Sequence, residues 1–179
     1  AANPDTAPLL PMLRGWYGTP STYLWYDQHS NPHTVLQGDG GEQGDPLMPA
    51  MFSLALHTAL TSISPHLQPG ETLLAYLDDL YVVSTPHRTV PIFNLLQANL
   101  DAHAGISLHL GKTRVWNAAG EEPTDIHLLQ PTPPAAPIWT GNWALPTNAQ
   151  GLQILGTPLG HPHYVAAALH DKQIGRAHV

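Results

Sequence analysis

Apolar residues recur along this chain at two spacings, one typical of helices and one typical of strands. Between residues 49 and 63 they fall on one face of a helix, and the same spacing returns from Ile92 to His103. A proline stands near the start of each segment, and Gly105 lies just past the second, as is common at helix ends. The pattern therefore predicts two amphipathic helices, each with a buried apolar face.

Shorter apolar runs have the length and composition of strands. Residues 21–26 and 33–37 are two such runs, and the turn-forming pair Asn31-Pro32 stands between them, which predicts a hairpin. Residues 106–110 are expected to form a strand, and 114–116 to continue extended. The early residues 1–8 are expected to be a loose lead-in.

Two further apolar runs, 73–77 and 80–83, enclose the acidic pair Asp78-Asp79. Because Asp is readily accommodated in tight turns, this pattern predicts a β-hairpin with both acids at its tip. Adjacent carboxylates repel one another unless a cation binds them, and a hard divalent metal ion suits two carboxylates. A solvated Asp-Asp turn is the other interpretation.

The segment from 117 to 150 is rich in proline, so long regular elements are not expected there. Residues 151–160 then predict an apolar strand that ends in a glycine turn, and a helix is expected to begin near Tyr164. The last six residues, 174–179, resemble a translated sequencing adapter, so we leave them out of the fold prediction and expect the chain to be part of a longer protein.

Composition limits the classes of function. The chain has 179 residues, enough for one domain with a core, and no cysteine, which excludes disulfides and thiolate metal sites. Neither a membrane-spanning run nor a secretory signal is recognisable, so we expect an intracellular protein. The 12 histidines are scattered, and a structural zinc site, for which His161 and His163 are the nearest candidates, is not expected. A net charge of −7 is unusual for a nucleic-acid binder, which normally carries a basic surface.

Three motifs nevertheless occur in a distinctive order. They are Gln43-Gly44-Asp45-Pro46-Leu47-Met48-Pro49, then Tyr76-Leu77-Asp78-Asp79 about thirty residues later, then Lys112 after a further helix and strand. This series resembles the reverse transcriptases of non-long-terminal-repeat (LINE-type) retrotransposons, over roughly residues 9–169. Met48 stands where the family usually has Ser, and His109 where many relatives have Asn.

The resemblance implies an α+β fold: a polymerase palm-like antiparallel sheet with helices on one face, a YxDD β-hairpin, part of the fingers and the start of the thumb. Residues 1–116 would be partial fingers and palm, 117–150 a linker or insertion, and 151–173 a primer-grip-like hairpin and the thumb start. The activity implied is RNA-directed DNA polymerisation in the nucleus, with an RNA template, a DNA primer and dNTPs as partners and no membrane. A palm must bind metal, which offers a reason for an acidic chain.

The resemblance also assigns roles to single residues. Asp78 and Asp79 would be catalytic ligands of two Mg²⁺ (or Mn²⁺) ions, and Lys112 would assist the leaving pyrophosphate. A first catalytic Asp would lie upstream; Asp5 does not follow an apolar strand and is rejected for this role. For Lys112 a solvated turn residue is the alternative.

Further roles concern substrate contacts. Gln43 and Gly44 would lie against template and nucleotide, and Tyr76 would point to the same face as Asp78, toward the primer end. Leu155 and Gly156 would form the primer grip. The alternatives are a solvated loop amide for Gln43 and a buried aromatic for Tyr76. For the whole chain, the alternative to a polymerase fragment is an inactive remnant that at most binds nucleic acid or a partner; the oligomeric state is left open.

Overall fold

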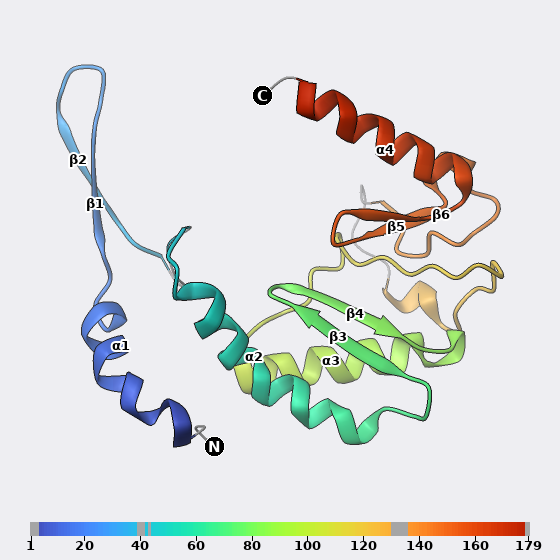
Figure 1. Cartoon of the computed structure of the whole chain (residues 1–179), viewed down its shortest axis with the longest axis horizontal. Coiled ribbons are helices and arrows are strands. Elements are labelled where there is room, and N and C mark those ends of the chain that lie inside the picture. The colour runs from blue at the N-terminus through green and yellow to red at the C-terminus, as the bar shows by residue number, and fades with distance from the viewer. Residues whose placement is uncertain (1–3, 39–41, 43, 130–135, 178–179) are drawn as a thin grey trace. The chain divides into compact units, whose positions relative to one another are not determined.

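The computed structural model describes residues 4–38, 42, 44–129 and 136–177 (Figure 1). The helices and strands of these residues are α1 (Leu10–Tyr17), β1 (Thr22–Tyr26), β2 (Pro32–Leu36), α2 (Met48–Ile63), β3 (Thr72–Tyr76), β4 (Asp79–Val83), α3 (Thr89–Ala104), β5 (Gly151–Ile154), β6 (Thr157–Gly160) and α4 (Pro162–Ala177). Short 3-10 helices lie at Pro4–Leu9, Ser64–His66, Pro86–Arg88, Ile126–Leu129 and Thr147–Ala149. The chain divides into two units, residues 1–48 and 49–179, which are described separately.

The first unit contains α1 and the hairpin β1–β2, which was predicted from the sequence. The strands pair antiparallel, from Thr22 opposite Leu36 to Tyr26 opposite Pro32. The expectation of a loose lead-in was wrong, because a 3-10 helix occupies Pro4–Leu9 and leads directly into α1.

The carboxylate of Asp27 organises the turn of this hairpin. It accepts hydrogen bonds from the backbone N–H groups of His29 (2.8 Å) and Asn31 (3.0 Å), and His33 Nε2 lies 3.1 Å away. The bond from the Asn31 backbone, with that from His33, lowers the pKa of Asp27 to about 2. The turn is thus held by one acidic side chain as well as by the Asn31-Pro32 pair that indicated it.

In the second unit, α2 and α3 pack through the apolar faces that the periodicity predicted. Leu56, Ala59 and Ile63 of α2 are buried, as are Val90, Ile92, Leu96 and Leu100 of α3. Gly105 ends α3 in a left-handed conformation, φ 63°, with its N–H directed to the carbonyls of Leu100 and Asp101. Both helices lie within three residues of their predicted bounds.

The hairpin β3–β4 has one face on these helices and one face open. Leu73 and Leu80 pack against the buried cluster of Ile63, Ile92 and Leu96. The strands pair from Thr72 opposite Val83 to Tyr76 opposite Asp79, so the turn consists of Leu77 and Asp78. The prediction that both acids form the tip was therefore wrong in detail: Asp78 is in the turn, and Asp79 is the first residue of β4.

The described residues form a mixed α+β structure, but their strands do not join into one sheet. They form three antiparallel two-stranded sheets. Residues 106–110, predicted to be a strand, have no assigned strand pairing. Ile106 and Leu108 pack into the helix clusters instead, and the N–H of Leu108 donates to Gln97 Oε1 of α3 at 2.8 Å. Burial of these side chains and the hydrogen bond to the Gln97 side chain thus take the place of the backbone hydrogen bonds between strands.

The proline-rich segment adds a third buried cluster. Ile126, Leu129, Ile138 and Trp139 pack with Val90 at the start of α3. A short parallel bridge joins Val115 to Trp139, with Val115 N–H bound to the Ile138 carbonyl at 2.8 Å. The described residues between 117 and 150 contain only short 3-10 helices, in agreement with the expected lack of long elements, yet they contribute to the core.

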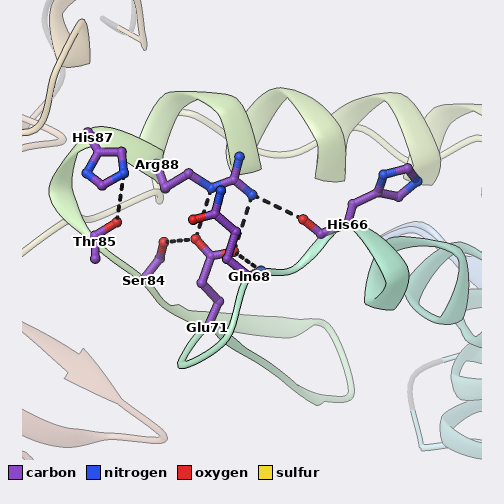
Figure 2. A network of polar contacts seen from close by, with 7 residues as sticks. All are labelled: His66, Gln68, Glu71, Ser84, Thr85, His87 and Arg88. Carbon is purple, nitrogen blue, oxygen red and sulfur yellow. Dashed lines mark hydrogen bonds and ion pairs between the residues drawn. The ribbon is translucent and has the colours of Figure 1, made fainter.

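A network around Glu71 fixes the base of the hairpin β3–β4 (Figure 2). The Glu71 carboxylate, 4% exposed, accepts from Arg88 Nε (3.0 Å) and Nη2 (3.2 Å), Ser84 Oγ (2.7 Å) and the Gln68 N–H (2.7 Å). Arg88 Nη2 also donates to the carbonyl of His66 at 3.1 Å. The Arg88 hydrogen bonds are the main cause that lowers the pKa of Glu71 to about 2. Groups from the segment after α2, both ends of the hairpin and the residue before α3 are thereby held together.

We predict that Glu71→Gln lowers the free energy of unfolding by about 2 kcal/mol at pH 7, because Arg88 loses its charged acceptor. The folded-state pKa lies below the ordinary 4.5, so the wild-type contribution is complete above pH 4.5 and is lost as pH falls toward 2. Urea unfolding between pH 3 and 7 should show a loss of this dependence in the variant. Glu122→Gln is the control, since Glu122 is exposed and makes no side-chain hydrogen bond with another described residue. Equal effects of the two substitutions would contradict the assigned role of Glu71.

Candidate functional site

The acidic pair lies at the open end of β3–β4, and both carboxylates are exposed. Leu77, the first turn residue, has φ 53°, a left-handed conformation that costs a branched non-glycine residue about 1 kcal/mol. Asp79 Oδ2 accepts a hydrogen bond from Tyr81 Oη at 3.1 Å. The hairpin therefore presents two carboxylates to solvent at a strained turn.

Tyr76 shares its face of the hairpin with Asp79 rather than with Asp78. The two residues are directly opposite in the register, and opposed side chains in an antiparallel pair point to the same side. The prediction that Tyr76 points with Asp78 assumed an unbroken strand, but β3 ends at Tyr76. The side chain is 60% exposed, which excludes the buried-aromatic alternative.

A second turn meets this hairpin from far along the sequence. The Leu155 N–H, at the turn between β5 and β6, donates to Tyr81 Oη at 3.0 Å across 74 residues. Leu155 and Gly156 both have positive φ, 47° and 76°, as tight hairpin turns require. The structure thus brings the residues predicted for the primer grip next to the acidic hairpin.

Two residues of this arrangement were not identified from the sequence. Tyr81 follows Asp79 by two positions in a strand, and this spacing alone places both on one face, so the signal was available. Lys172 of α4 donates from Nζ to the carbonyl of Gly156, a contact that no local pattern indicates. Beside Lys172 lies an open groove of about 380 Å³ between β5 and α4, whose polar lining includes Asn148, Gln153 and Asp171.

Lys112 is not joined to the acids by a described contact. Its backbone N–H donates to the His109 carbonyl at 2.9 Å, in a turn, and its side chain is exposed. No hydrogen bond or ion pair among the described residues links it to Asp78 or Asp79. Its catalytic role remains a prediction from the motif order.

The Gln43-Gly44-Asp45 segment belongs to the first unit, and Gln43 lies outside the described residues. Gly44 has φ +92°, and a Cβ there would meet nothing within 4 Å. Its backbone conformation by itself therefore favours glycine, whereas the family resemblance implied close approach of template and nucleotide.

Asp45 has a structural role that the motif did not reveal. Oδ1 accepts from the Leu47 N–H at 2.8 Å just before α2, and Oδ2 accepts from Tyr17 Oη at 2.6 Å. The bond from Tyr17 is the main cause that lowers the pKa of Asp45, and it raises the pKa of Tyr17 to about 12. Within the first unit, this side chain therefore joins Leu47 to Tyr17 at the end of α1.

The donor chemistry at the acidic hairpin suits Mg²⁺, which binds through one or two carboxylates, waters and substrate phosphates. Asp78 and Asp79 supply two exposed carboxylates. Within residues 4–38, 42, 44–129 and 136–177, no three His, Asp or Glu side chains gather into a metal-binding group. His161 and His163 lie with ring centroids 5.0 Å apart, and the His163 Nδ1 is 2.9 Å from Thr147 Oγ1.

We predict that Gly44→Ala lowers the thermal unfolding midpoint, with a loss of about 1 kcal/mol, because alanine is disfavoured at positive φ. Gly38→Ala is the matched control: its φ lies outside the left-handed region, and a Cβ there would also meet nothing within 4 Å. Circular dichroism melting of both variants gives the comparison. If the two variants have the same unfolding midpoint, the backbone conformation does not explain why residue 44 is glycine.

Comparison with known proteins does not extend these observations. No helix in the described part of the chain is long and apolar enough to cross a membrane. Searches against protein-family models, curated protein sequences and solved structures found no match to this chain. The function is therefore argued from the geometry of the two turns and from the motif order.

Proposed function

We propose that this chain is the palm part, with portions of the fingers and thumb, of an RNA-directed DNA polymerase of the retrotransposon type. The observation that carries the proposal is the contact between the acidic end of the hairpin β3–β4 and the turn of β5–β6. The exposed carboxylate of Asp79, which follows Asp78 in the chain, is connected to the Leu155-Gly156 turn through Tyr81. A polymerase needs this pairing, because the primer 3′ end must be held next to the metal ligands.

The residues of the chain would divide the work of nucleotidyl transfer. When bound, two Mg²⁺ ions would activate the primer hydroxyl and neutralise the triphosphate. Asp78, in the turn, is the proposed main ligand, and Asp79 supports it. The backbone of Leu155 and Gly156 would hold the primer strand near its end.

Tyr76 and Lys112 have proposed roles around this centre. The exposed ring of Tyr76, on the face shared with Asp79, offers a surface against which a sugar or base can stack. Lys112 would supply positive charge to the leaving pyrophosphate. Gln43 and Gly44 would contact template and nucleotide, as the motif order implies.

One observation favours a second candidate, an inactive remnant with a binding role only. Asp78 and Asp79 are the two acids available at the hairpin, and the described residues bring no third carboxylate to them. Two adjacent carboxylates are few for fixing two ions. The net charge of −7 also gives little long-range attraction for a polyanionic template.

Metal binding separates the two candidates. We predict that Mn²⁺ broadens the backbone NMR signals around Asp78, and that Asp78→Asn weakens this binding at least about tenfold, because a direct carboxylate ligand is lost. Asp101→Asn, an exposed acid on α3, is the control and should leave it unchanged. Equal Mn²⁺ affinity in the wild type and Asp78→Asn would refute the proposed site.

A primer-extension assay tests the chain as it stands. We expect weak binding of primer-template and no extension with Mg²⁺ or Mn²⁺, because the hairpin offers only the Asp78-Asp79 pair to the ions. The assay should be run together with a measurement of solution mass. Robust extension by a monodisperse monomer would show that the catalytic carboxylates have been misplaced.

A further inference from the structure

Tyr81 has a hydrogen-bonding arrangement with a fixed direction. The Leu155 N–H can only donate, so Tyr81 Oη must accept from it, at 3.0 Å. The phenol then has its own O–H left to donate, and Asp79 Oδ2 lies 3.1 Å away. The result is a directed chain from a backbone amide, through the phenol, to a carboxylate.

We propose that Tyr81 is a positioning residue that couples the Asp79 carboxylate to the Leu155-Gly156 turn, so that metal binding at the acids and the conformation of the turn depend on each other. The inference rests on the proposed function and adds a residue to it. In this arrangement Tyr81 orients one carboxylate oxygen and leaves the other, Oδ1, available for an ion. It makes no contact with substrate itself.

The turn requires external support, which explains why such a tether would matter. Leu155 has φ 47°, a conformation that a leucine adopts only when surrounding contacts favour it. Two side chains hold this backbone: Tyr81 accepts from the Leu155 N–H, and Lys172 Nζ donates to the Gly156 carbonyl. These contacts come from β4 and from α4. The turn is therefore positioned by tertiary contacts as well as by its own sequence.

Reciprocity gives the coupling a measurable consequence. If an ion binds the carboxylates in the orientation that Tyr81 favours, it also stabilises the bridge, and the Leu155 amide becomes better protected from exchange. A phenylalanine at position 81 fills nearly the same volume but removes both hydrogen bonds. The structure of the hairpin should survive, while the coupling should disappear.

The experiment uses the whole isotope-labelled chain and measures hydrogen exchange at the Leu155 amide, with and without saturating Mg²⁺. In the wild type we expect Mg²⁺ to slow exchange by about fivefold or more, the lower range of ordinary coupling. In Tyr81→Phe we expect faster exchange, no Mg²⁺ effect, and a Mn²⁺ affinity about tenfold weaker, as for other residues that orient a metal ligand. Thermal melting should change little. Tyr26→Phe, an equally conservative change at an exposed tyrosine of the β1–β2 hairpin, should behave as the wild type.

The outcomes separate this inference from the proposed function. Mn²⁺ binding that depends on Asp78, together with Leu155 exchange that is unaffected by Mg²⁺ in the wild type, would overturn the coupling and leave the metal site intact. Unchanged Mn²⁺ affinity in a well-folded Tyr81→Phe would also overturn it. Absence of Mn²⁺ binding near Asp78 in the wild type would refute the proposed function itself. A variant that merely loses stability would melt lower and still retain the Mg²⁺ effect, which would again contradict the role of Tyr81.

Discussion

A carboxylate removed from water must find donors within the protein, and in this chain that requirement shapes the second unit. The Glu71 side chain is 4% exposed, and its oxygens are bonded by Arg88, Ser84 and the Gln68 amide. The two ends of β3–β4, the start of α3 and the loop after α2 must come together to supply these groups (Figure 2). A buried ion pair does not by itself make a fold more stable than a hydrophobic contact would, but it accepts few alternative geometries. Its effect is to fix the base of the hairpin.

With the base fixed, the two faces of the hairpin have different surroundings. Leu73 and Leu80 complete the core formed by α2 and α3. On the other face Leu74, Tyr76 and Val83 are all more than half exposed. Asp79 and Tyr81 belong to this same face, because they alternate with Leu80 along β4. The helices thus bury one side of a short hairpin and leave the acidic end and much of the other side exposed.

The contact at Tyr81 depends on this arrangement. The strand β4 carries Tyr81 on the open face, and the turn of β5–β6 reaches it there. Both participating turns contain a leucine at positive φ, Leu77 and Leu155, where glycine or asparagine would be less strained. Strain of this kind persists where the surrounding structure over-determines it. Here the surrounding contacts are the strand register at one turn and the bonds from Tyr81 and Lys172 at the other.

Local patterns in the sequence determined most elements of the fold. Helical periodicity gave α2 and α3, and turn chemistry gave the hairpin at residues 22–36, because these signals depend on neighbours a few positions apart. The same local signals placed Asp78 in a tight turn. They failed for residues 106–110, whose apolar alternation matches a strand but whose side chains pack into the helix clusters.

Only the tertiary structure decided which of these elements meet. Tyr81 and Leu155 are 74 residues apart, and nothing in either local sequence indicates that one bonds the other. Local sequence patterns likewise did not identify Arg88 as the partner of Glu71, because the two residues lie on different elements. At Gly44 the motif suggested contact with a ligand, whereas the structure gives a different explanation. Its φ of +92° is a backbone conformation that favours glycine. Sequence patterns report local geometry, whereas contacts between distant segments follow from how buried faces and buried charges are satisfied together.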